Sequence, residues 1–188
     1  MTPVDRSNHY EAAFESYLRA RRLGYVAVDE THRAMLDDAP VKSLDFIVHG
    51  PGGVRLLVDV KGRRFPGGAK ANPKKTWETW STREDVDGLL RWAERFGPGY
   101  RALLVFAYQI VPVVRLPEGT VDLWHWRGRD YLYRAVPVED YRRSMRVRSP
   151  RWGTVGLPGA VFRELVRPFR DFTECRGLPA LARTKVDA

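Results

Sequence analysis

The sequence predicts an α/β domain in which a central mixed β-sheet is flanked by helices. Apolar residues recur at helical spacing over residues 9–22 and again over residues 86–96, while β-prone runs bounded by glycine and proline lie between these segments. Residues 102–108 are almost wholly apolar, which is typical of a strand buried on both faces. A chain of 188 residues is long enough for one such core and too short for two, so we expect a single domain over residues 1–188.

The first helix is expected from His9 to Arg22, with Asn8 as its N-cap and Gly24 at its end. Glu11 and Glu15 lie one turn apart and share a face, which by itself indicates a solvent-exposed stripe. A strand over residues 25–28 should follow. The charged segment 29–40 is expected to be an exposed loop.

A β-hairpin is predicted next, and it carries the most informative polar residues. Side chains alternate between the two faces of a strand, so Asp59 and Lys61 should share one face while Val60 points to the other. Asp45 begins the partner strand. If the register places Asp45 beside Asp59, two carboxylates and an ammonium converge, which is costly unless a cation or a substrate uses them. The hairpin comprises residues 44–48 and 54–60, joined by Gly50, Pro51, Gly52 and Gly53.

The second half of the chain supplies the remaining elements. Ser81 and Glu84 have the spacing of a capping box for a helix that ends at Gly97, and residues 102–108 should form the centre of the sheet. We expect a core over about residues 8–109, a C-terminal extension over about 110–175, and a frayed tail over 176–188. The extension should contain a hairpin (121–126 and 131–135), a short helix (138–145) and a last amphipathic helix that carries Val161 to Phe169.

The charge of the chain indicates a polyanionic partner. The net charge is +9, the isoelectric point is near 10.0, and most of the basic residues are arginine, whose planar guanidinium binds phosphate well. An arginine-rich surface that serves only solubility is the alternative. Trp77 and Trp80 could stack on bases or cover the core, and Arg146–Trp152 forms a second basic stretch. The candidate nucleic-acid-binding residues are Arg63, Arg64, Lys70, Lys74 and Lys75.

The cellular setting expected from the sequence is the cytoplasm. Cys175 is the single cysteine, so neither an internal disulfide nor a cysteine zinc site can form, which fits a reducing compartment. The longest apolar run, residues 102–114, is interrupted by Gln109 and Pro112 and is too short to cross a bilayer. We therefore expect a soluble protein without a membrane partner.

The order of these elements resembles the core of the PD-(D/E)XK nuclease superfamily, in particular its Holliday-junction-resolvase branch, over roughly residues 8–109. The shared features are a helix with glutamate, a strand that starts with Asp45, a hairpin turn, a strand with Asp59-x-Lys61, a helix and a strand. The stretch His9–Glu15 also resembles the signature of the bacterial HYExAFE proteins. Leu44 stands where the superfamily often has proline, so the match depends on strand context and on the 14 positions between Asp45 and Asp59.

This resemblance implies a restriction-endonuclease-like fold and a metal-dependent nuclease. Its catalytic residues would be Glu11, Asp45, Asp59 and Lys61. The ligands of Mg²⁺ or Mn²⁺ would be Asp45, Asp59, the Val60 carbonyl and Glu11, with Glu15 as the alternative on the first helix; carboxylate and carbonyl oxygens are ligands that Mg²⁺ prefers. Lys61 could orient the attacking water or stabilise charge on the phosphate, and its purely structural role would be a salt bridge to Asp59.

Three classes of function fit the sequence. The first is a nuclease that hydrolyses phosphodiester bonds, with DNA as the expected substrate. The second is a non-catalytic nucleic-acid-binding module on a nuclease-like fold. The third is a structural or assembly protein whose C-terminal hairpin makes an interface in a homodimer. Presence of the acids together with Lys61 favours the first, and DNA or RNA, branched or linear, stay open as substrates.

Overall fold

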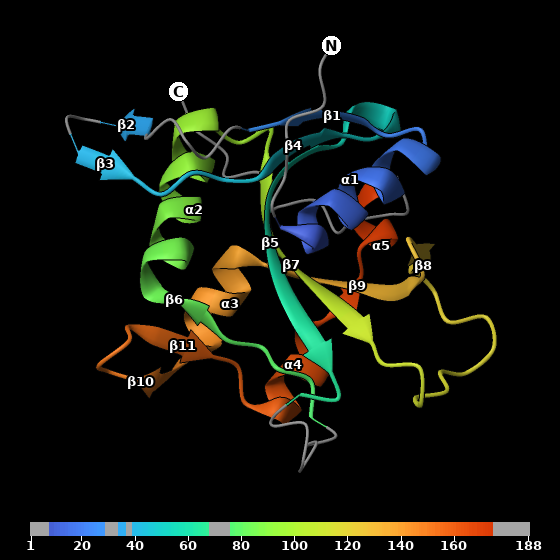
Figure 1. Ribbon diagram of the computed structural model, residues 1–188. Coiled ribbons are helices and arrows are strands. Elements are labelled where there is room, and N and C mark those ends of the chain that lie inside the picture. Colours follow the sequence, from blue (N-terminus) through green and yellow to red (C-terminus); the bar gives the residue numbers. More distant parts are fainter. Residues whose placement is uncertain (1–7, 29–33, 37–38, 68–75, 175–188) are drawn as a thin grey trace.

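A computed structural model of the chain describes residues 8–28, 34–36, 39–67 and 76–174, and in these ranges a curled mixed sheet lies between two helical layers (Figure 1). The helices are α1 (His9–Ala20), α2 (Arg83–Phe96), α3 (Val138–Ser144), α4 (Gly159–Leu165) and α5 (Arg170–Thr173), with a 3-10 turn at Pro51–Gly53. The main sheet contains β1 (Gly24–Ala27), β4 (Phe46–His49), β5 (Arg55–Phe65), β7 (Arg101–Ile110), β8 (Leu123–Trp126), β9 (Arg129–Pro137) and β12 (Arg167–Pro168).

The strands of the main sheet follow the order β1-β4-β5-β7-β9-β12, and β8 also pairs with β9. β5 and β7 run parallel, and α2 connects them across one face of the sheet. The other pairings in this sheet are antiparallel. Segments expected to form a C-terminal extension thus supply β8, β9 and β12 to the same sheet as β5.

The described residues also form two smaller sheets. β6 (Ser81–Thr82), β10 (Arg146–Ser149) and β11 (Thr154–Gly156) form a three-stranded antiparallel sheet in the order β10-β11-β6. β2 (Ala34–Leu36) pairs with β3 (Ala39–Val41). The prediction of a loop over residues 29–40 was therefore wrong for its described part, because a hairpin can form from short runs that show no clear alternation of apolar and polar residues.

Hydrophobic clusters cover both faces of the main sheet. Val58 and Val60 pack with α1 and α5 on one face, while Leu57 packs with α2, α3 and α4 on the other. Since side chains alternate along β5, the face of Leu57 is also that of Asp59 and Lys61. Contacts of β5 with α1 on one side and with α2 on the other hold this strand between the two helical layers (Figure 1).

Most of the elements expected from the sequence are confirmed. Asn8 caps α1 by accepting a hydrogen bond from the Tyr10 N–H at 3.1 Å, although α1 ends at Ala20 rather than at Gly24. The hairpin of β4 and β5, the buried central strand β7, the hairpin of β8 and β9, and the short α3 are all present. The tail 176–188 lies outside the described residues.

Two predicted helix features were wrong in detail. The capping box of α2 is formed by Thr82 and Asp85, one residue after the predicted Ser81 and Glu84. The single last helix is instead α4 and α5, separated by β12. Pro168 lies in that separation, and proline cannot donate the backbone hydrogen bond that a continuous helix needs.

Within the described ranges, no helix is long and apolar enough to cross a membrane.

Candidate active site

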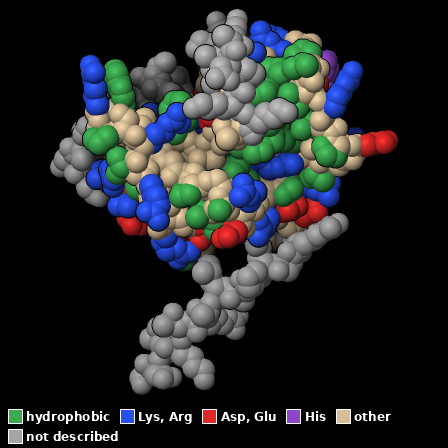
Figure 2. All heavy atoms as spheres, turned by 90° about the horizontal axis from the view of Figure 1, so that it is seen from below, with side chains coloured by type: hydrophobic (Ala, Val, Ile, Leu, Met, Phe, Trp, Pro, Cys, Tyr) green, Lys and Arg blue, Asp and Glu red, His purple; other side chains and the backbone are tan. Residues whose placement is uncertain are grey.

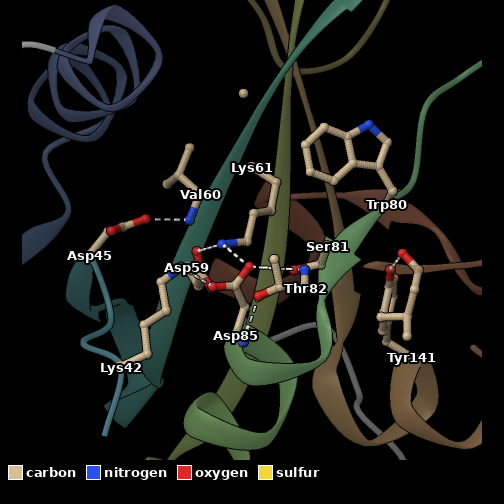
Figure 3. Close-up of polar contacts among 12 residues, drawn as sticks. Lys42, Asp45, Asp59, Val60, Lys61, Trp80, Ser81, Thr82, Asp85 and Tyr141 are labelled. Atoms are coloured by element: carbon tan, nitrogen blue, oxygen red, sulfur yellow. Dashed lines mark hydrogen bonds and ion pairs between the residues drawn. The ribbon is translucent and has the colours of Figure 1, made fainter. Parts of the chain in front are cut away.

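Asp59 and Lys61 form an ion pair on the α2-facing side of β5. The Lys61 Nζ lies 2.7 Å from Asp59 Oδ1, and both side chains are largely buried, with exposed fractions of 14% for Lys61 and 8% for Asp59. The prediction that these residues share a face is confirmed (Figure 3). Both charges stand at the middle of a long strand, which places them inside the protein rather than on a solvent-exposed edge.

The first turn of α2 contributes a second carboxylate to Lys61. Asp85 Oδ2 lies 3.0 Å from Lys61 Nζ and accepts hydrogen bonds from the Ser81 hydroxyl at 3.0 Å and the Thr82 N–H at 3.1 Å. Lys42 forms an ion pair with the other oxygen of Asp85. Asp85 therefore caps α2 and binds two lysines with a single side chain (Figure 3).

Asp85 and Lys42 are site residues that the sequence analysis missed. The spacing from Thr82 to Asp85 is that of an N-cap and its N3 residue, and this signal could have marked the start of α2. It could not have shown that the same carboxylate reaches Lys61, because that contact depends on how α2 packs against β5.

Electrostatics keep Lys61 charged. Burial alone would lower the pKa of Lys61, but the Asp59 and Asp85 carboxylates raise it above its ordinary value. Burial would raise the pKa of Asp85, yet Lys61 and Lys42 hold it below its usual range. Asp59 differs, because its burial raises its pKa in spite of the Lys61 ammonium. The cluster thus holds a protonated lysine between two carboxylates with opposite pKa shifts.

Asp45 lies where β4 begins, at the edge of β5. Its N–H donates to the Val58 carbonyl at 2.9 Å, and its Oδ2 accepts from the Val60 N–H at 2.5 Å. The Asp45 carboxylate therefore accepts a hydrogen bond from β5 at the point where the backbone pairing of β4 with β5 ends. A strand residue presents its N–H and carbonyl toward the same neighbour, so the Val60 carbonyl also faces the Asp45 side. The Asp45 charge also contributes to the raised pKa of Lys61.

The start of α1 meets β5 directly after Lys61. A Cβ atom added to Gly62 would overlap the Tyr10 ring, so only glycine allows this approach. His9 Nδ1 lies 2.9 Å from the Tyr131 hydroxyl, which connects the same turn of α1 to β9. The helix that carries Glu11 is therefore fixed against the strand that carries Asp59 and Lys61, on the opposite face.

The two glutamates of α1 have different surroundings. Glu11 accepts a hydrogen bond from the Asn8 side chain at the start of the helix. Glu15 accepts from the Tyr25 hydroxyl at 2.8 Å and pairs with Arg19 at 2.7 Å, so it contacts β1. Glu15 is thus held beside β1, whereas Glu11 is held at the first turn of α1.

Among the predicted nucleic-acid-binding residues, Arg63 differs from the expectation. Its side chain is buried, and it donates to the carbonyls of Gly62 and Trp80 while its guanidinium stacks 3.6 Å from the centre of the Trp80 ring. Arg64 is exposed. Trp77 stacks on Phe65 at 3.7 Å and covers the core. Lys70, Lys74 and Lys75 lie outside the described residues.

The donor set matches what Mg²⁺ accepts, although it is small. Among residues 8–28, 34–36, 39–67 and 76–174, no three His, Cys, Asp or Glu side chains are grouped closely enough to hold a metal ion together. Mg²⁺ commonly uses one or two carboxylates and completes its shell with water and substrate phosphate. Asp45 directly before β4, Asp59 on β5 and the carbonyl of Val60, which follows Asp59, are oxygen donors of this kind.

The sheet order and the two helical layers define a resolvase-like, restriction-endonuclease-like fold. The chain is similar to the 1.6 Å structure of Hjc, a Holliday junction resolvase from the archaeal hyperthermophile Archaeoglobus fulgidus, with a TM-score of 0.51. The two are 15% identical, and the match covers 88% of this chain and 98% of that chain. The sequence matches no protein-family model and no curated protein. The predicted fold class is confirmed, and the HYExAFE resemblance stays a prediction.

Proposed function

We propose that this protein is a divalent-metal-dependent nuclease of the PD-(D/E)XK type that hydrolyses phosphodiester bonds in DNA. The observation that carries the proposal is the buried ion pair of Asp59 and Lys61 in a resolvase-like fold. The Asp45 carboxylate lies beside this pair in the chain fold, since it accepts a hydrogen bond from the N–H of Val60, the residue between Asp59 and Lys61. Buried charges are costly, and a cluster of them in mid-strand is expected where the protein uses them.

Each residue of the cluster has a role that follows from its surroundings. Asp45, Asp59 and the Val60 carbonyl would hold Mg²⁺ or Mn²⁺, with Glu11 as a further candidate ligand. When bound, such an ion lowers the pKa of water and offsets phosphate charge. Lys61 stays protonated because its pKa is raised, so it is suited to stabilise negative charge developing on the phosphate rather than to accept a proton.

The surface charge supports a nucleic acid as the partner. The net charge is +9, and Figure 2 shows Lys and Arg side chains spread over the face seen from below, whereas carboxylates lie mainly near its rim. We also expect a homodimer, in line with the resolvase-like fold, and a cytoplasmic location, in line with the single cysteine.

A cleavage assay tests the proposal. Purified protein is incubated with labelled linear duplex, four-way junction, single-stranded DNA and RNA, each with Mg²⁺, with Mn²⁺ or with EDTA. We expect metal-dependent cleavage of DNA that Asp59→Asn abolishes. Cleavage that persists in EDTA, or that Asp59→Asn leaves undiminished, would place the active site elsewhere.

A non-catalytic nucleic-acid-binding module is the second candidate. It is favoured by the way Lys61 is engaged with both Asp59 and Asp85, since a structural ion-pair cluster would have the same contacts. In this case the wild-type protein binds DNA in EDTA and cuts none of the substrates with either metal.

A further inference from the structure

A groove lies between residues 76–80 and two strands of the three-stranded sheet, β10 and β11. The groove has a volume of about 440 Å³, and it is lined on one side by residues 76–80 and on the other by β10, the end of β11 and Leu157. Trp80, Arg146 and Arg148 line it together. Ligand pockets are usually hollows of about 300–1,000 Å³ with a few placed polar groups, so this groove has the size of a ligand site.

Trp80 is held rigidly at this groove. The Arg63 guanidinium stacks on its ring at 3.6 Å and donates to its carbonyl, while the indole N–H donates to Glu78 at 3.2 Å. Arg63 itself is buried, and its Nε has no hydrogen-bond partner among the described residues. A buried arginine beneath a half-exposed tryptophan fixes an aromatic surface in place at little further entropy cost on binding.

The groove also carries exposed positive charge. Arg146 and Arg148 are exposed on β10, and the Arg148 guanidinium lies 5.9 Å from the centre of the Trp80 ring. A fixed aromatic ring beside exposed guanidinium groups is the arrangement that binds single strands, with bases stacked on the ring and phosphates on the arginines. Glu78 is the acidic residue in the lining, and its carboxylate accepts the Trp80 indole hydrogen bond.

The distance to the cluster fits a single substrate. Arg63 follows Lys61 by two residues on the same face of β5, a rise of about 6.6 Å along the strand. The arginine that stacks on Trp80 is therefore a near neighbour of Lys61 along β5. Trp80 directly precedes Ser81, which contacts Asp85 (Figure 3).

We infer that this groove binds an unpaired base near the scissile phosphate, with Trp80 as the stacking surface and Arg146 and Arg148 as phosphate contacts. The inference deepens the proposed nuclease function, on which it rests, by naming the substrate class: DNA with unpaired bases, such as a flap or a single strand, is bound in preference to continuous duplex.

Binding in EDTA tests the groove separately from cleavage. Fluorescence anisotropy is measured with a continuous duplex, a flapped duplex and a single strand of DNA. Stacking contributes about 1–3 kcal/mol per base, so Trp80→Leu should weaken binding of the flap and single strand about tenfold and leave the duplex within about twofold. Trp80→Phe should retain most of the affinity. Trp126→Leu is the matched control, since Arg127 covers that ring in the same way at 4.6 Å.

The arginines give a second test if Trp80→Leu fails to fold. Arg148→Gln removes an exposed charge and should weaken flap binding more than Arg95→Gln, an exposed arginine on α2. It should also reduce the log–log salt slope on single strands by about 0.7, because the variant neutralises one phosphate fewer.

Equal losses on duplex and flap for Trp80→Leu, or equal effects of the two arginine variants, would overturn the inference. A protein that never cleaves yet shows Trp80-dependent flap binding would refute the nuclease proposal alone, so the two failures are distinguishable.

Discussion

The Asp85 carboxylate contacts the Lys61 ammonium at 3.0 Å, and this contact joins the first turn of α2 to the middle of β5. The same carboxylate accepts the Thr82 N–H of its own capping box. Asp85 is thus a positioning residue for Lys61, since the carboxylates of Asp59 and Asp85 together fix the position of the ammonium. One side chain, that of Asp85, therefore both caps α2 and contacts the candidate catalytic Lys61.

Asp85→Asn should slow cleavage and shift its pH dependence. Loss of this carboxylate removes one of the charges that raise the pKa of Lys61, so the pKa should fall and the alkaline limb of the rate profile should move to lower pH. The rate is measured against pH for wild type, Asp85→Asn and Asp87→Asn, whose carboxylate pairs with Arg142 on the surface. An unshifted alkaline limb in Asp85→Asn would show that Asp85 does not tune Lys61.

Asp85 should also make stability depend on pH. Its pKa is lowered in the folded protein, so its contribution is fully present above the unfolded pKa of about 3.9 and is lost as pH falls toward the folded pKa. Denaturant unfolding between neutral and acid pH measures this. The free energy of unfolding of Asp85→Asn should be lower than that of the wild type by about 1.5–3 kcal/mol at neutral pH, as expected for hydrogen bonds to charged groups, and this difference should narrow in acid. A constant gap would contradict the prediction.

Gly62→Ala should destabilise the protein, because its Cβ would overlap the Tyr10 ring. Forced overpacking costs about 1–3 kcal/mol. A double-mutant cycle with Tyr10→Ala should recover part of this loss, since the smaller side chain makes room. Gly24→Ala is the control, because a Cβ there has its nearest contact at 3.5 Å. The measurement is the thermal unfolding of the wild type and these variants. If the losses of stability in Gly62→Ala and Tyr10→Ala simply add in the double variant, the Tyr10 ring is not what the added Cβ overlaps.

Asp59→Asn and Lys61→Ala should separate cleavage from binding. Both should lower cleavage by orders of magnitude, because one removes a candidate metal ligand and the other the charge placed to assist the phosphate. Both variants should still bind DNA in EDTA. Asp59→Asn should bind at least as tightly as the wild type, because it removes a negative charge that repels the phosphate backbone. Single-turnover cleavage and anisotropy are measured on the same preparations. Parallel loss of binding and cleavage would indicate a folding defect instead.

The first helix offers a paired comparison. Glu11→Gln should reduce cleavage more than Glu15→Gln, because the superfamily resemblance assigns the metal ligand to Glu11, while Arg19 and Tyr25 hold Glu15 beside β1. The measurement is the cleavage rate at several metal concentrations, where loss of a ligand raises the concentration needed for half activity. A larger effect of Glu15→Gln would mean that Glu15, and not Glu11, is the metal ligand on α1.

Local features of the site could be predicted, and features set by packing could not. The shared face of Asp59 and Lys61 follows from strand alternation alone, and the tight glycine turn predicted the hairpin that brings in Asp45. Asp85 was missed because its role depends on where α2 rests on β5. Arg63 was predicted as a phosphate contact because sequence carries no direct measure of burial, and the structure places it under Trp80.

The acid–lysine cluster and the groove differ in how much of the chain must be folded to form them. Asp59, Lys61 and Asp85 come from β5 and the first turn of α2, which belong to one β-α-β unit of β5, α2 and β7. The groove needs the distant C-terminal half, since Tyr141 donates to the Thr79 carbonyl at 2.7 Å and Thr79 donates to Leu157 at 3.0 Å. Local opening of β10 and β11 would abolish substrate discrimination while the charged cluster persisted, so hydrogen exchange should report a lower protection level for these two strands than for β5 and α2.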